Sequence, residues 1–179
     1  MAALKPVIAA WVVAVTFPCA AAPAVVSEPA LSLDGAPAVD ASVAAVAMVW
    51  PVINPLSRYR HARRALDNAT PPAWVGNIPA RHDLYWKTEA AMAEGNPVLA
   101  LETGEEVQTP PALWIQGRPD PAHDYRDPDS PVDANEPERF IGAYRKAGGR
   151  IEMVSLEYAD RARTSMEPVK SFLVAELTR

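Results

Sequence analysis

Cysteine, net positive charge and long hydrophobic runs are all scarce in this sequence of 179 residues, and each scarcity argues against a class of function. The single cysteine, Cys19, cannot form a disulfide within the chain and has no second thiol with which to hold a metal, so nothing in the sequence requires an oxidising compartment. The net charge of −5 provides no basic field for nucleic acid or anionic lipid. The apolar run from Val7 to Phe17 is too short to span a bilayer. We therefore expect neither a nucleic-acid partner nor a membrane partner.

Residues 1–42 show no pattern of regular elements and are interpreted as an unplaced N-terminal segment followed by a linker at 28–42. Lys5, the apolar run and the small residues up to Ala22 imitate the three regions of a secretory signal peptide. The alternative is alternate-start or frame-shifted sequence that does not belong to the fold, because proline and alanine are abundant. We expect a cytoplasmic protein, or a secreted one if residues 1–22 are a true signal peptide.

Residues 43–179 have the pattern of one α/β domain, in which buried parallel strands are flanked by helices. Apolar runs bounded by proline or glycine predict about three strands, which lie at 43–50, between Pro111 and Gly117, and at 151–156. Apolar periodicity and start or stop signals predict helices at 58–66 with Ser57 as the cap, at 80–94, at 136–146 and at 167–177.

The stretch from Pro110 to Asp120 is predicted to form the central strand and to deliver a carboxylate at its end. Two prolines end the preceding segment, an apolar run follows, and Gly117 breaks that run just before the acid. In an open α/β sheet, ligands and catalytic groups collect at the carboxyl ends of the strands. Asp120 is therefore the main candidate for a functional residue.

This strand and acid, followed by the helix-like Glu138–Gly149 and the strand-like Arg150–Val154, resemble the C-terminal half of an α/β-hydrolase of the esterase or lipase type. The resemblance covers roughly the last two-thirds of the chain. It implies a partial α/β-hydrolase fold with a cap-like helical insertion at about 56–97, and it assigns to Asp120 the role of the acid in a Ser-His-Asp triad. Intact relatives hydrolyse carboxylic esters through an acyl-serine intermediate and need no cofactor or metal.

The rest of the family's catalytic pattern is missing from this sequence. No serine lies in a Gly-x-Ser-x-Gly elbow, and no His-Gly-Gly oxyanion loop is present. Arg161 or a neighbour stands where the family has its histidine, and arginine cannot accept a proton from serine at neutral pH. His123 could replace that base, although an Asp-x-x-His pair is often structural. His61 and His82 are interpreted as surface residues of helices.

Three further groups of residues have both a functional and a structural interpretation. Aromatic residues of the cap-like insertion could line an acyl pocket or simply pack between helices; they are Trp74, Tyr85 and Trp86. Basic residues on the first helix could bind an anion or form a solvated face; they are Arg60, Arg63 and Arg64. Acidic residues and a histidine after the central strand could hold a hard cation or form a solvated loop with Asp-turns; they are Asp120, His123, Asp124, Asp127 and Asp129.

The sequence thus predicts a truncated α/β-hydrolase-like protein that is inactive alone. The alternative is a non-catalytic binding or interaction module derived from the same fold, which would take a small-molecule ester or apolar ligand. A third interpretation is a product of a truncated or frame-shifted gene with no selected activity. An exposed strand edge, left where half of the sheet is missing, would favour self-association.

Overall fold

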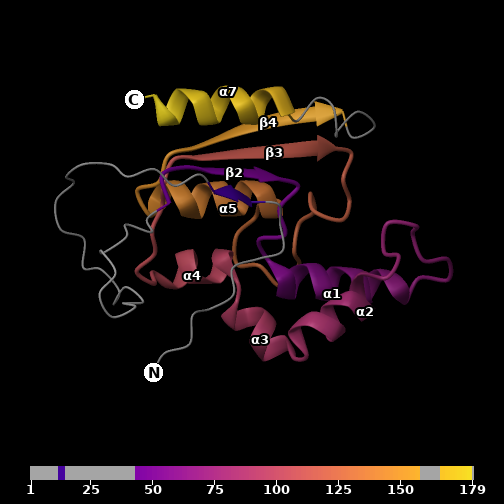
Figure 1. Cartoon of the computed structure of the whole chain (residues 1–179). Helices are drawn as coiled ribbons and strands as arrows, with labels where there is room; N and C mark the ends of the chain where they lie inside the picture. Colours follow the sequence, from indigo (N-terminus) through magenta and orange to yellow (C-terminus); the bar gives the residue numbers. More distant parts are fainter. Residues whose placement is uncertain (1–11, 15–42, 158–165, 179) are drawn as a thin grey trace, which may run out of the picture.

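A sheet of four strands in the order β1-β2-β3-β4 lies at the centre of the molecule, with helices on both of its faces (Figure 1). The computed structural model describes residues 12–14, 43–157 and 166–178. The strands are β1 (Val12–Ala14), β2 (Val46–Val49), β3 (Ala112–Arg118) and β4 (Ile151–Glu157). β2, β3 and β4 are parallel, whereas β1 pairs with β2 antiparallel. The prediction of an α/β fold with three parallel strands and flanking helices is confirmed.

β3 is the central parallel strand, as predicted. Ala112 to Ile115 pair with β2 on one side, and the whole strand from Ala112 to Arg118 pairs with β4 on the other. Residues 112–117 are all buried, because both edges of the strand are hydrogen-bonded and both of its faces are covered. The strand therefore holds the chain that follows it at a fixed point in the molecule.

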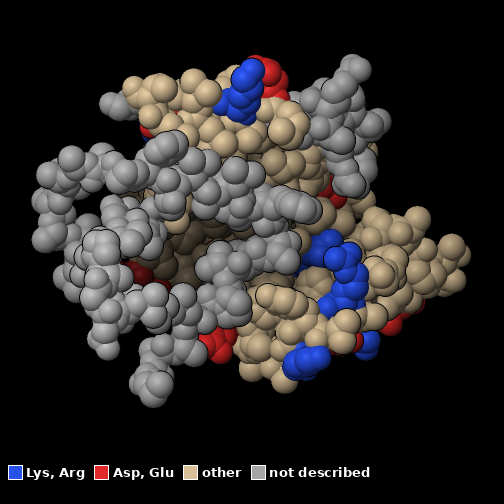
Figure 2. Space-filling model, viewed as in Figure 1, with Lys and Arg blue, Asp and Glu red and all other residues tan. Residues whose placement is uncertain are grey.

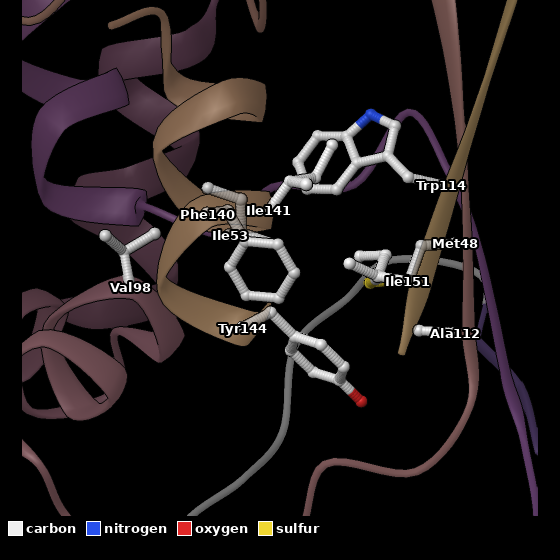
Figure 3. Packing of buried hydrophobic residues seen from close by; sticks show 9 residues of the cluster. All are labelled: Met48, Ile53, Val98, Ala112, Trp114, Phe140, Ile141, Tyr144 and Ile151. Carbon is white, nitrogen blue, oxygen red and sulfur yellow. The ribbon is translucent and has the colours of Figure 1, made fainter. Parts of the chain in front are cut away.

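Alternate side chains of the sheet pack into two separate hydrophobic layers. On one face, Leu113 and Ile115 pack against Val169 and Phe172 of α7 (Met166–Leu177). On the other face, strand residues pack against α5 (Glu136–Lys146) and Val98; these strand residues are Met48, Ala112, Trp114 and Ile151. Figure 3 shows the aromatic rings of Trp114, Phe140 and Tyr144 in this second layer.

Four helices form an insertion between β2 and β3, here called the helical insertion (residues 55–103). They are α1 (Pro55–Leu66), α2 (Ile78–Trp86), α3 (Glu89–Glu94) and α4 (Pro97–Thr103). The prediction of one helix over 80–94 is wrong, because Lys87 takes a left-handed φ of 65° and Thr88 caps a new helix with its side chain. The helix ends before Pro97, as predicted, but a further helix, α4, begins there. The side chain of Asn96 caps α4 by accepting hydrogen bonds from the N–H groups of Val98 and Leu99.

α1 begins earlier than the sequence indicates. Pro55 occupies the first turn, and the side chain of Asn54 caps the helix by accepting a hydrogen bond from the N–H of Ser57 at 3.0 Å. Ser57 therefore lies inside the helix. The prediction that it caps the helix is wrong. α5 begins at Glu136, and Glu138 Oε2 accepts from the N–H of Asn135 at 3.4 Å.

Several predictions concern residues that the structure leaves undescribed. The signal-like pattern and the linker lie outside the described residues except for Val12–Ala14, and so do residues 158–165, which include Arg161. β1 pairs with β2 through Val12–Met48, Val13–Ala47 and Ala14–Val46. The edge of β2 that faces away from β3 is thus paired over these residues. Within the described part of the chain, no helix is long and apolar enough to cross a membrane.

Candidate functional site

Asp120 lies just beyond the end of β3 and is buried, with 4 % of its surface exposed. Gln116, the last inward-facing polar residue of β3, donates from Nε2 to Asp120 Oδ2 at 3.3 Å. Gln116 is itself held by the indole N–H of Trp114, which donates to its Oε1 at 3.0 Å. A buried chain of hydrogen bonds therefore runs from the core of the sheet to the carboxylate and fixes its position.

His123 is the second partner of Asp120. Its Nδ1 lies 3.0 Å from Oδ1 and 2.9 Å from Oδ2 of the carboxylate. The backbone creates this pairing, because the N–H groups of His123 and Asp124 both donate to the carbonyl of Asp120, at 3.1 Å and 2.8 Å. A carboxylate on Nδ1 holds the imidazole in place and leaves Nε2 as the nitrogen for other partners, which is the arrangement of the acid and base in a catalytic triad.

Ser57 is engaged in a separate buried polar network. Its hydroxyl lies 2.9 Å from the hydroxyl of Tyr125 and donates to Glu136 Oε1 at 3.3 Å. Burial is the main cause that raises the pKa of Tyr125. Ser57 lies within a helix, where the strand-to-helix turn of a nucleophile elbow is absent. It therefore has the contacts of a structural serine.

The same network joins α5 to the helical insertion. Asn54 Nδ2 donates to Glu136 Oε2 at 2.8 Å, and Asn96 Nδ2 donates to Asn54 Oδ1 at 2.7 Å. Arg139 bonds to Glu136 Oε1 at 3.1 Å and to both oxygens of Glu102 at 2.7 Å. Burial raises the pKa of Glu136, although Asn54 and Arg139 act in the opposite direction. Sequence reasoning did not predict this network, because it joins segments that are far apart along the chain.

The acidic loop after β3 is paired with arginines. Arg118 Nε donates to Asp124 at 2.8 Å, and Arg64 contacts Asp127 at 3.3 Å and Asp129 at 3.2 Å. Arg60 bonds to Glu89 at 2.7 Å. These contacts satisfy the acids that could have served as cation ligands, and among the described residues no cluster of His, Cys, Asp and Glu could hold a metal ion. Two of the three basic residues considered for an anion patch therefore form ion pairs within the chain.

The two helix histidines are not simple surface residues. His82 is 7 % exposed, so its predicted surface position is wrong, and its Nδ1 lies 2.9 Å from the carbonyl of Ile78. His61 is half-buried and its ring is stacked between Trp74 and Tyr125, with ring centroids 4.6 Å and 3.8 Å away. Burial is the main cause that lowers the pKa of both histidines. His82 is covered where α2 packs on α1, with Tyr59 stacked on it, whereas His61 is covered by residues of two loops; the sequence pattern revealed neither contact.

A cavity of about 460 Å³ lies between the loop after β2 and α2. Two of the three aromatic residues proposed as pocket walls, Tyr85 and Trp86, line it, whereas Trp74 packs on His61 instead. Three basic residues also line the cavity, namely Arg58, Arg81 and His82. In the view of Figure 2, Lys and Arg side chains gather over the region that α1 and α2 occupy in Figure 1. The remaining lining residues that the structure describes are apolar: Val52, Ile78 and Leu84.

The cavity and the Asp120–His123 pair are neighbours. A smaller hollow contains His123 and Tyr125, and it shares Val52 and Arg58 with the cavity. Both therefore lie at the carboxyl ends of β2 and β3, the edge of the sheet at which the sequence predicted a site. Arg58 is the functional candidate that sequence reasoning missed, although it belongs to the same basic helix as Arg60, Arg63 and Arg64.

No family model matches this sequence, and comparison with curated proteins and with solved structures likewise found no match.

Proposed function

We propose that this chain is a truncated α/β-hydrolase-like protein, similar to carboxylic ester hydrolases, that does not cleave esters by itself. The observation that carries the proposal is the position of Asp120, which is buried at the end of the central parallel strand and hydrogen-bonded to Nδ1 of His123. A carboxylate and an imidazole in this arrangement correspond to the acid and the base of a Ser-His-Asp triad. The Gly-x-Ser-x-Gly nucleophile is missing from the sequence, so no acyl-serine can form at the usual place.

The test is labelling of the purified chain with a fluorophosphonate, after a cooperative thermal transition has shown that the sample is folded. We expect no stoichiometric labelling of any serine and no hydrolysis of p-nitrophenyl esters above the background of free imidazole. His123→Gln serves as a control, because any slow hydrolysis by the Asp120–His123 pair would disappear in this variant. Rapid labelling of a single serine in a folded sample would contradict the proposal.

A second candidate function is a non-catalytic binding module for a small apolar molecule. The cavity of about 460 Å³ favours it, since it falls within the range of roughly 300–1,000 Å³ that small-molecule sites occupy. Its apolar and aromatic walls, with a few polar groups, also match the composition of such sites. Binding of a neutral aromatic probe to the folded chain, measured by equilibrium dialysis, tests this function. Absence of binding by every apolar probe would exclude it.

A further inference from the structure

The basic residues of the cavity give it a charge preference that an apolar binding site does not need. Arg58 lies on α1 and reaches the cavity from one side, while Arg81 and His82 lie on α2. Arg58 Nε and His82 Nε2 are buried and, among the described residues, have no hydrogen-bond partner. Buried polar groups are normally hydrogen-bonded, so two orphans in the wall of one cavity indicate that a partner from outside the chain supplies the missing contacts.

The orphaned Nε of Arg58 indicates that the partner is an anion. A guanidinium N–H can only donate, so its partner must be an acceptor, and carboxylates match the fork of an arginine. Burial, and to a smaller extent the charge of Arg81, lowers the pKa of Arg58, and a bound anion would relieve both effects. Asp120 and Tyr125 act on Arg58 in the opposite direction, but neither lines the cavity of about 460 Å³.

The apolar walls define the rest of the ligand. Tyr85 and Trp86 form a T-shaped pair with centroids 5.0 Å apart, and both line the cavity beside Leu84. Tyr85 and Leu84 are more than half exposed, which leaves a large apolar surface without a partner in the described part of the chain. An aromatic or branched aliphatic body would cover this surface while its charged group reaches Arg58.

We propose that the cavity binds a monocarboxylate with an aromatic or branched apolar body, whose carboxylate pairs with Arg58 and Arg81. One negative charge matches Arg58, whose Nε is buried, because Arg81 is exposed and partly screened by water. This inference rests on the binding function proposed above for the same cavity, and it adds the chemical class of the ligand.

The experiment compares two probes of nearly the same shape, 1-naphthylacetate and its neutral amide, by equilibrium dialysis with ligand fluorescence. We expect the wild-type chain to bind the carboxylate at least about tenfold more tightly than the amide, as a charge-assisted contact would give. Arg58→Met should remove this preference, because it weakens binding of the carboxylate much more than binding of the amide. Arg63→Met is the matched control, since Arg63 is exposed on the same helix and does not line the cavity.

The outcomes separate the two proposals. If neither probe binds to folded protein, the binding function itself is wrong. If both bind equally, the binding function stands and the carboxylate preference is wrong. A preference that persists in folded Arg58→Met would overturn the role of Arg58. If Arg58→Met fails to fold, Tyr85→Glu tests the same preference for negative charge, because it adds a negative charge at an exposed position of the cavity wall. It must weaken binding of the carboxylate several-fold more than binding of the amide.

Discussion

His123 Nδ1 lies 2.9 Å from Oδ2 of Asp120, and the two residues are joined by a single turn of backbone. The pairing is thus local, yet the carboxylate is buried by the long-range packing of β3 between β2 and β4. The loop provides the geometry, and the sheet provides the low-dielectric surroundings. A substitution at Asp120 therefore affects stability even if the chain has no catalytic activity.

Asp120→Ala is expected to lower the free energy of unfolding by about 1–3 kcal/mol, because Gln116 Nε2 and His123 Nδ1 lose their acceptor. Urea denaturation of the wild type and the variant measures this loss. Asp133→Ala is the control, since Asp133 forms an exposed ion pair with Arg126 and its removal should change stability by less than about 0.5 kcal/mol. Equal effects of the two substitutions would show that Asp120 is not held as described.

Gly117→Ala is expected to destabilise the protein by about 1–3 kcal/mol through overpacking. A Cβ at this position would lie 2.6 Å from Cζ2 of Trp50, closer than packed atoms approach. Gly142→Ala is a control with the opposite expected sign, because nothing lies within 4 Å of its Cβ and it is an exposed position inside α5. That change should stabilise the protein by about 0.5–1 kcal/mol, and thermal denaturation of both variants checks the pair.

Arg139→Met is expected to cost about 3–5 kcal/mol, because it leaves Glu136 and Glu102 without their charged partner. Side chains of Arg139 and Glu136 are 4 % and 3 % exposed, so water cannot replace the lost contacts. Lys146→Met, at an exposed position of the same helix, should change stability by less than about 0.5 kcal/mol. A small effect of Arg139→Met in denaturant titrations would mean that the ion pair contributes little.

The stability of the protein is expected to fall as the pH falls below about 6.5, the ordinary pKa of histidine. Burial lowers the pKa of His82, so below this pH the unfolded chain binds a proton that the folded chain does not. The charged and titratable groups that act on His82 are Arg58, Arg81 and Asp83, and the ring of Tyr59 is stacked on it at 6.1 Å. The contribution of His82 is at most about 1.4 kcal/mol per pH unit.

Free energies of unfolding measured at about pH 7.5 and about pH 5.5 test this linkage. His82→Gln should reduce the loss on acidification, because glutamine does not titrate. His61→Gln should act in the same direction, since burial also lowers the pKa of His61. A pH dependence that is identical in the wild type and in both variants would exclude the histidines as its source.

The parts of the fold that the sequence predicted correctly depend on local signals. β3 was recognisable because Pro111 and Gly117 flank a run that is apolar from Ala112 to Ile115, and such a run suits a strand that is buried on both faces. The position of Asp120 followed directly from that strand. The pairing of His123 with Asp120 was also open to sequence reasoning, because both residues lie in one turn, although their proximity alone does not assign a function.

The parts that were missed depend on contacts between distant segments. The break at Lys87 comes from a left-handed backbone that lysine rarely adopts, so helical periodicity continued through it in the sequence. The burial of His82 and the access of Arg58 to the cavity depend on how α1 and α2 pack. No local pattern distinguishes Arg58, which lines the cavity, from Arg60, which pairs with Glu89.

The amide of Asn54 contacts Asn96 and Glu136, which are 42 and 82 positions away in the sequence. Each of the three side chains satisfies a buried group of another, so replacing one of them leaves a neighbour unpaired. Descendants of this chain would therefore keep the three residues together or lose them together. These positions should evolve as a single correlated unit, and the joint pattern of change in relatives would reveal the contact between α1, α4 and α5 without any structure.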